Sequence, residues 1–221
     1  MNASGPTRSS VALELGIVVL LAALFVVFFR VRAGYVDVAL ALAALGLIAA
    51  STLRSRALWS QLPGGSADRR AARRGAWRRM AVFTGGAAGG LLLLGAGLGY
   101  SAGGWPGVLQ RLANWHFLIA CGLYLPWALL QQFIFQFYLL GRLLWLAPYW
   151  FAVPAAAAAF SLVHFPRVPV MLGTALAGIV WAASYSQHRT LLPLAASHAV
   201  LGSALHYWVF GRDLASLWCA L

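Results

Sequence analysis

The sequence contains few charged residues and hardly any acidic ones. Only 9% of its 221 residues are charged, whereas a soluble domain carries about 25%. The acids are one Glu and three Asp, and lysine is absent, while 62% of the residues are hydrophobic. This composition excludes an ordinary soluble domain and predicts an integral, multi-pass membrane protein.

Cysteine is also scarce, which excludes two kinds of site. Cys121 and Cys219 are too far apart in the sequence to predict a disulfide framework or a cysteine metal site, and we expect no cofactor. Cys219 is third from the C-terminal end, whereas a prenylation box needs a cysteine fourth from the end. The sequence therefore does not predict that this chain is itself prenylated.

The positive charge is concentrated in one segment. The formal net charge is +12, and eight of the sixteen arginines lie in residues 54–79. This pattern predicts a cytoplasmic loop that binds anionic lipid headgroups, rather than a nucleic-acid site. The N-terminus is then cytoplasmic as well, and we expect a bacterial cytoplasmic membrane.

Apolar stretches of roughly bilayer length predict an all-α bundle of about seven transmembrane helices. We expect two regions: residues 1–112, with the basic loop 54–79, and a membrane core over 113–221. The first apolar stretch is interpreted as a retained anchor, and residues 103–117 are interpreted as an interfacial helix before the fourth span. The predicted spans are 11–29, 35–53, 80–100, 115–142, 148–165, 170–187 and 191–210.

Strongly polar side chains inside predicted spans are functional candidates, because burying them in lipid is costly. Counted from the predicted cytoplasmic ends, Gln131, His164 and His198 lie at similar depth, roughly 14–21 Å into the membrane. Gln132 and Gln136 are one helical turn apart and share a face. Such residues also serve as structural hydrogen-bonding groups between helices, and this is our interpretation of the remaining polar residues His188 and His206.

The order of these residues resembles the motifs of the CPBP family, which comprises type II CAAX prenyl proteases and bacterial relatives linked to bacteriocin processing and immunity. The first family motif, E-E-x-x-F-R followed by Arg-Leu, is similar to Gln131–Gln136, with Phe135, Arg142 and Leu143 in register. The later motifs, F-x-x-x-H and H-A-x-x-N, correspond to residues 160–164 and 198–202, and an intervening glycine corresponds to Gly178.

The resemblance implies a membrane endopeptidase that acts on membrane-anchored proteins, in CAAX-like processing or C-terminal sorting. In that family, a glutamate and the second-motif histidine activate water, and the third-motif histidine and asparagine stabilise the oxyanion. Carried over, the catalytic positions are Gln131, Gln132, His164 and His198. The positions that contact substrate are Gln136, Phe135, Phe160 and Gly202, and no metal ligand is expected.

The departures from these motifs leave two functions open. Both glutamate positions are Gln, the first-motif arginine is Gln136, and the asparagine position is Gly202. Because an amide is not a usable base near neutral pH, the chain is either an endopeptidase with a histidine base or an inactive relative. An inactive relative would bind a transmembrane segment or lipid as a sorting, immunity or assembly factor. A replacement carboxylate has to come from Glu14, Asp37, Asp68 or Asp213, and the absence of inverted repeats disfavours a transporter.

Overall fold

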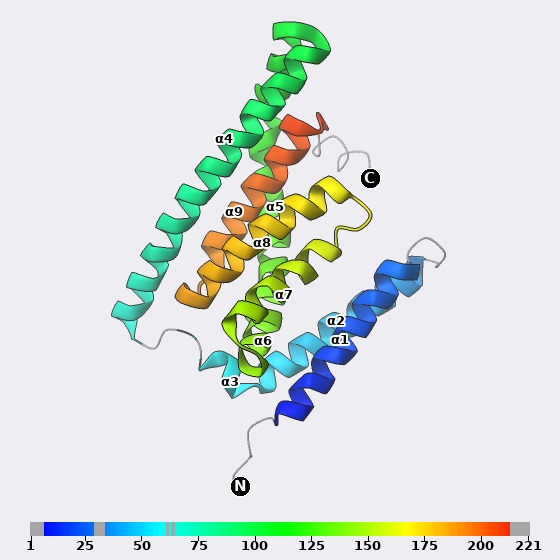
Figure 1. The fold of residues 1–221 in the computed structure, drawn as a ribbon, viewed down its shortest axis with the longest axis vertical. Helices are drawn as coiled ribbons and strands as arrows, with labels where there is room; N and C mark the ends of the chain where they lie inside the picture. The colour runs from blue at the N-terminus through cyan, green and yellow to red at the C-terminus, as the bar shows by residue number, and fades with distance from the viewer. Residues whose placement is uncertain (1–6, 29–33, 61, 63–64, 213–221) are drawn as a thin grey trace. The chain divides into compact units, whose positions relative to one another are not determined.

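The computed structural model describes residues 7–28, 34–60, 62 and 65–212. This part of the chain is almost entirely helical and contains no β-strand, which confirms the predicted all-α class (Figure 1). Each of the seven predicted spans falls on helix, and three helices in the described residues are long and apolar enough to cross a membrane. The helices are α1 (Arg8–Phe28), α2 (Gly34–Arg54), α3 (Arg56–Trp59), α4 (Ser66–Leu112), α5 (His116–Gln132), η1 (Phe133–Leu140), α6 (Gly141–Leu146), α7 (Tyr149–Leu162), α8 (Val168–His188), α9 (Leu192–Ala204) and η2 (Leu205–Val209).

Large apolar side chains are exposed along most of these helices. Val82, Leu93 and Leu118 are each at least 70% exposed, and they lie on α4 and α5, within two of the three long apolar helices. A soluble protein rarely exposes so much continuous apolar surface. The surface is instead what lipid requires of an integral membrane protein.

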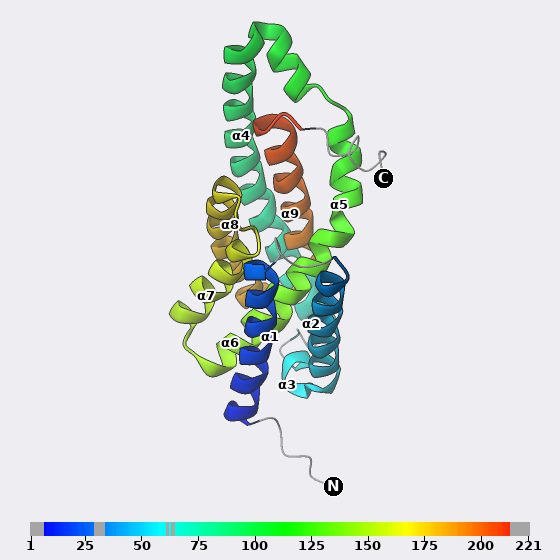
Figure 2. The same cartoon turned by 90° about the vertical axis from the view of Figure 1, so that its right-hand side faces the viewer.

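The chain divides into two compact units, and the first comprises Met1–Arg69 and Phe133–Arg189. In it, α1 and α2 lie side by side as an N-terminal hairpin, and α7 packs along α8 (Figures 1 and 2). η1, a helix with π-type hydrogen bonding, packs against α7, α8 and α2. A Cβ atom on Gly178 would lie 3.2 Å from Ala157 Cα, so glycine at this position permits the close α7–α8 contact.

The second unit comprises Arg70–Gln132 and Thr190–Leu221. α5 packs against α9 through three buried alanines, and Thr84 of α4 donates a hydrogen bond to Ser197 of α9 (2.7 Å). α4 bends near its C-terminal end, where Gly104 has φ +61°, a conformation that favours glycine. The bend separates residues 105–112 from the long part of the helix, as expected for the segment before the fourth span (Figure 2). The three alanines are Ala128, Ala195 and Ala199.

Two local features differ from the sequence-based expectation. α4 begins at Ser66, inside the segment predicted as the basic loop 54–79, because its Ala- and Arg-rich sequence favours helix. The helix containing the glutamines changes to π-type hydrogen bonding over Phe133–Leu140, which hydrophobic periodicity does not reveal. The boundary predicted between 112 and 113 stays a prediction.

Candidate functional site

The glutamine segment follows the end of α5 into η1. Gln132 is the last residue of α5 and Gln136 lies in η1, and both side chains are 0% exposed. Neither amide makes a hydrogen bond within the described part of the chain, and the buried Oε1 of Gln131 makes none either. Leaving such a group unpaired costs about 1–3 kcal/mol each. These amides therefore keep donors and acceptors that no group in the described residues uses.

The π-type helix itself marks this segment as unusual. π-helical turns are rare, are less regular than α-helix and occur frequently at functional sites. In η1, Gln136, Phe137 and Tyr138 are buried in succession, so side chains on more than one face are covered. The segment thus holds Gln136 in a fully packed environment.

In the first unit, the second-motif residues form an aromatic cluster with η1. The rings of Phe135 and Phe160 meet edge to face, with centroids 5.0 Å apart, and His164 lies 5.2 Å from Phe160. Phe160 is fully buried and also contacts Trp181 of α8. Three of the residues predicted from the motifs, Phe135, Phe160 and His164, are therefore neighbours in the structure.

One hydrogen bond fixes the tautomer of His164, which lies in the turn after α7. Its Nδ1 atom is 2.9 Å from the backbone oxygen of Phe160. Since a carbonyl oxygen only accepts, Nδ1 carries the proton and Nε2 carries the lone pair of the neutral ring. His164 is partly exposed. In the neutral form of the ring, Nε2 is therefore the nitrogen that can act as a general base.

In the second unit, His198 is held in a different environment. It lies on α9, is 3% exposed, and its Nε2 is 3.3 Å from the hydroxyl of Tyr124 on α5. The two rings meet edge to face, with centroids 5.5 Å apart. Gly202, one turn further along α9, is partly exposed, and its carbonyl oxygen accepts a hydrogen bond from His206 Nδ1 (3.0 Å). His206 thus has a structural partner, in agreement with its interpretation as a structural residue.

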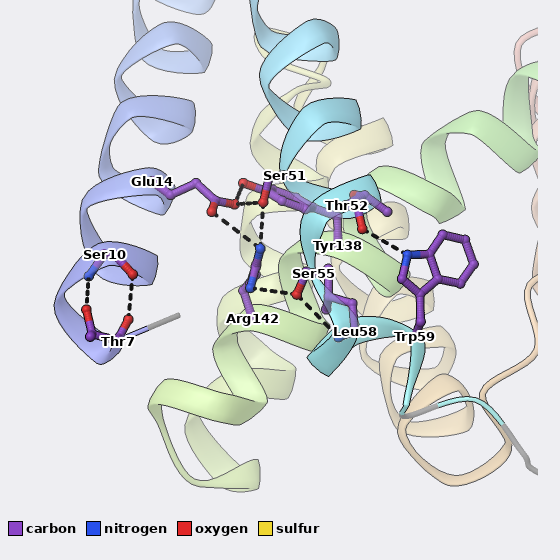
Figure 3. A network of polar contacts seen from close by, with 10 residues as sticks. All are labelled: Thr7, Ser10, Glu14, Ser51, Thr52, Ser55, Leu58, Trp59, Tyr138 and Arg142. Atoms are coloured by element: carbon purple, nitrogen blue, oxygen red, sulfur yellow. Dashed lines mark hydrogen bonds and ion pairs between the residues drawn. The ribbon is translucent and has the colours of Figure 1, made fainter. Parts of the chain in front are cut away.

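A polar network in the first unit joins the N-terminal hairpin to η1 and α6 (Figure 3). Arg142 Nη2 lies 3.3 Å from Glu14 Oε2, and Glu14 Oε1 accepts hydrogen bonds from Tyr138 and Ser51, each at 2.5 Å. Arg142 also donates to Ser51 and Ser55. The Arg142 side chain is 5% exposed and that of Glu14 is 18% exposed. The network is therefore a largely buried ion pair with neutral hydrogen-bonding neighbours.

This network bears on whether Glu14 replaces the glutamates that the first motif lacks. Both carboxylate oxygens of Glu14 accept hydrogen bonds from Arg142 and hydroxyl groups, so Glu14 is a structural carboxylate in this state. Asp68 is exposed in the first turn of α4, while the Asp37 side chain and Asp213 lie outside the described residues. In the described residues no three His, Cys, Asp or Glu side chains form a group suited to bind a metal ion.

Two contributors to these sites, Tyr124 and Glu14, do not follow from the sequence motifs. Tyr124 was missed because it lies outside every motif, and an aromatic residue in an apolar helix carries no special signal. The sequence offers Glu14 only as a replacement base, although the i,i+4 spacing of Tyr138 and Arg142 is a signal for a shared acidic partner. That Gln131, His164 and His198 share one depth in the membrane stays a prediction.

Residues 112–204 match a family model described as type II CAAX prenyl endopeptidase Rce1-like. No match was found among curated proteins, and none was found among solved structures. The matched segment contains all three motifs on which the predicted resemblance depends, from Gln131 to Gly202. The predicted resemblance is confirmed: residues 112–204 of this membrane protein are similar to the Rce1-like type II CAAX prenyl endopeptidases.

Proposed function

We propose that this protein is an intramembrane endopeptidase that cleaves membrane-anchored polypeptides and activates water with a histidine in place of a glutamate. The observation that supports this most directly is the hydrogen bond from His164 Nδ1 to the Phe160 carbonyl, because it leaves the lone pair on Nε2. The family match supports the reaction class. The partly exposed Gln131, whose Oε1 has no hydrogen-bond partner in the described residues, supports the substrate class, since an amide suits an extended peptide backbone.

In this mechanism, His164 Nε2 removes a proton from water as the water oxygen attacks the carbonyl carbon of the substrate. The carbonyl π bond opens to an oxyanion, and by the resemblance of its motif His198 is the residue proposed to support that oxyanion. The oxyanion then collapses, the carbon–nitrogen bond breaks, and the proton held by His164 passes to the leaving amine. Gln131, the partly exposed one of the three glutamines, holds the substrate backbone by hydrogen bonds and moves no proton.

The basic segment provides the proposed orientation in the membrane. Six arginines of α4 precede Met80, and five of them are exposed: Arg69, Arg70, Arg73, Arg74 and Arg78. We place this segment at the cytoplasmic face, where anionic headgroups attract arginine by about 1 kcal/mol per residue. A bacterial cytoplasmic membrane, rich in anionic lipid, meets this requirement.

The test is His164→Ala in the purified protein, reconstituted with a membrane-anchored reporter that carries a C-terminal segment. Loss of the general base should slow cleavage by about 10²–10⁴-fold. His188→Ala at the end of α8 is the matched control and should leave the rate unchanged. Equal cleavage by the wild-type protein and His164→Ala would exclude the histidine base.

A second candidate is a non-cleaving protein that holds a transmembrane segment or lipid. The observation in its favour is that amides replace both glutamates of the first motif and remain buried, without a hydrogen-bond partner in the described residues. A photo-crosslinking residue at Phe135 should then trap an uncleaved membrane polypeptide. The triple substitution Gln131→Glu, Gln132→Glu, Gln136→Arg separates the candidates, because cleavage gained only in the triple variant means that the wild-type protein binds without cleaving.

A further inference from the structure

The contact between Tyr124 and His198 links two helices of the second unit at a residue to which the proposed mechanism gives a role. The phenol oxygen lies 3.3 Å from His198 Nε2, and the two rings meet edge to face. Because a hydroxyl both donates and accepts, Nε2–H can donate to the phenol oxygen while the phenol O–H points elsewhere. His198 is 3% exposed, whereas Tyr124 is partly exposed. Of the two, Tyr124 is the more exposed side chain.

The position of the tyrosine ring depends on Gly202. A Cβ atom at residue 202 would lie 2.8 Å from Tyr124 Cε1, which is closer than side chains tolerate, so only glycine leaves room for the ring as it lies. On its other side, Tyr124 packs against the core of three alanines, Ala128, Ala195 and Ala199. Small residues thus surround the ring and determine where its hydroxyl lies. Such restriction is what a hydrogen-bond donor needs to act without reorganisation.

We propose that Tyr124 donates a hydrogen bond to the carbonyl oxygen of the bound polypeptide, and that His198 acts through it by donating Nε2–H to the phenol oxygen. The inference rests on the proposed function and deepens it, because it assigns the oxyanion donor to a residue outside the motifs. A chain of two hydrogen bonds polarises the outer O–H and makes it a stronger donor. His198 is then a positioning residue and Tyr124 the residue that touches the reacting atom.

The pair also admits a purely structural interpretation, in which it only holds α5 to α9. Tyr124→Phe separates the two, because it removes the hydroxyl and keeps the ring above Gly202. Removing one oxyanion donor lowers kcat by about 10²–10³-fold, and we expect that loss with KM nearly unchanged. A structural role alone would change thermal stability and leave kcat within about twofold. Tyr149→Phe, at an exposed tyrosine of α7, is the matched control.

A binding measurement with two peptide ligands tests the role of Tyr124 separately from the endopeptidase activity. A peptide aldehyde forms a tetrahedral hydrate, whereas the matching peptide alcohol cannot mimic the oxyanion. We expect the wild-type protein to bind the aldehyde at least tenfold more tightly than the alcohol, and Tyr124→Phe to lose that preference. Retention of the preference in Tyr124→Phe would overturn the role of Tyr124 while the endopeptidase stands. No preference in the wild-type protein, together with no cleavage, would overturn both.

Discussion

Two groups of buried polar side chains in the helical stretch 131–142 differ in whether they have hydrogen-bond partners. Arg142 is largely buried, and its terminal nitrogens reach Glu14 and two serines. Gln132 and Gln136 are buried more completely, yet their amides make no hydrogen bond within the described residues. The charged group therefore has internal partners, and the neutral groups do not.

This difference indicates that the ion-pair network of Arg142 contributes to stability, whereas the glutamines contribute to function. An ion pair with hydrogen-bonded oxygens stabilises the contact between the N-terminal hairpin and α6, provided that both partners are present. Buried amides without partners destabilise the fold, and a protein retains them only where they serve another purpose. We therefore expect substitutions in the network to change unfolding, and substitutions of the glutamines to change activity.

The largest expected effect is that of Glu14→Gln. It leaves Arg142 buried without a counter-charge, and breaking such a pair costs about 3–5 kcal/mol of unfolding free energy. Unfolding in detergent, followed by circular dichroism, should show this loss. The double variant Glu14→Gln, Arg142→Met should recover most of it, and Arg78→Gln at an exposed position of α4 should stay within about 0.5 kcal/mol of wild type. Unchanged unfolding of Glu14→Gln would contradict a structural role for the network.

A smaller effect is expected for Tyr138→Phe, which removes one of the donors to Glu14 Oε1. Because Ser51 and Arg142 still donate to the carboxylate, the loss should be that of one hydrogen bond to a charged group, about 1.5–3 kcal/mol. The same unfolding measurement applies. A loss as large as that of Glu14→Gln would mean that the three donors do not act independently.

Gln136→Leu, at a 0% exposed position, is expected not to lower the unfolding free energy, in contrast to the two preceding substitutions. Removing an unpaired buried amide should leave the unfolding free energy unchanged or raise it by about 1–3 kcal/mol. Cleavage of the reporter, or capture of the membrane partner, should fall at least tenfold. Gln187→Leu, at an exposed position of α8, controls for the added apolar surface. Destabilisation by Gln136→Leu, with function retained, would assign this glutamine to packing.

Much of the fold and half of the site geometry follow from the sequence. Apolar run length predicts the helices, because lipid requires every backbone group to be paired within a span. Spacing within one helix places Phe160 next to His164, since residues four apart share a face. Glu14 and Tyr138 are separated by 124 positions in the sequence, and Tyr124 and His198 are separated by 74 positions. Hydrophobic periodicity does not predict contacts between residues so far apart in the sequence.

The π-type helix over Phe133–Leu140 makes the number of residues in this segment as important as their identity. It takes up one more residue per hydrogen-bonded turn than α-helix does. Conversion of this segment to ordinary α-helix with no residue removed would rotate everything that follows by about 100°. Arg142 would then turn away from Glu14 while every motif residue was still present. The orientation of Arg142 toward Glu14 therefore depends on the π-type turn, and a substitution that restores α-helix at constant length should break it.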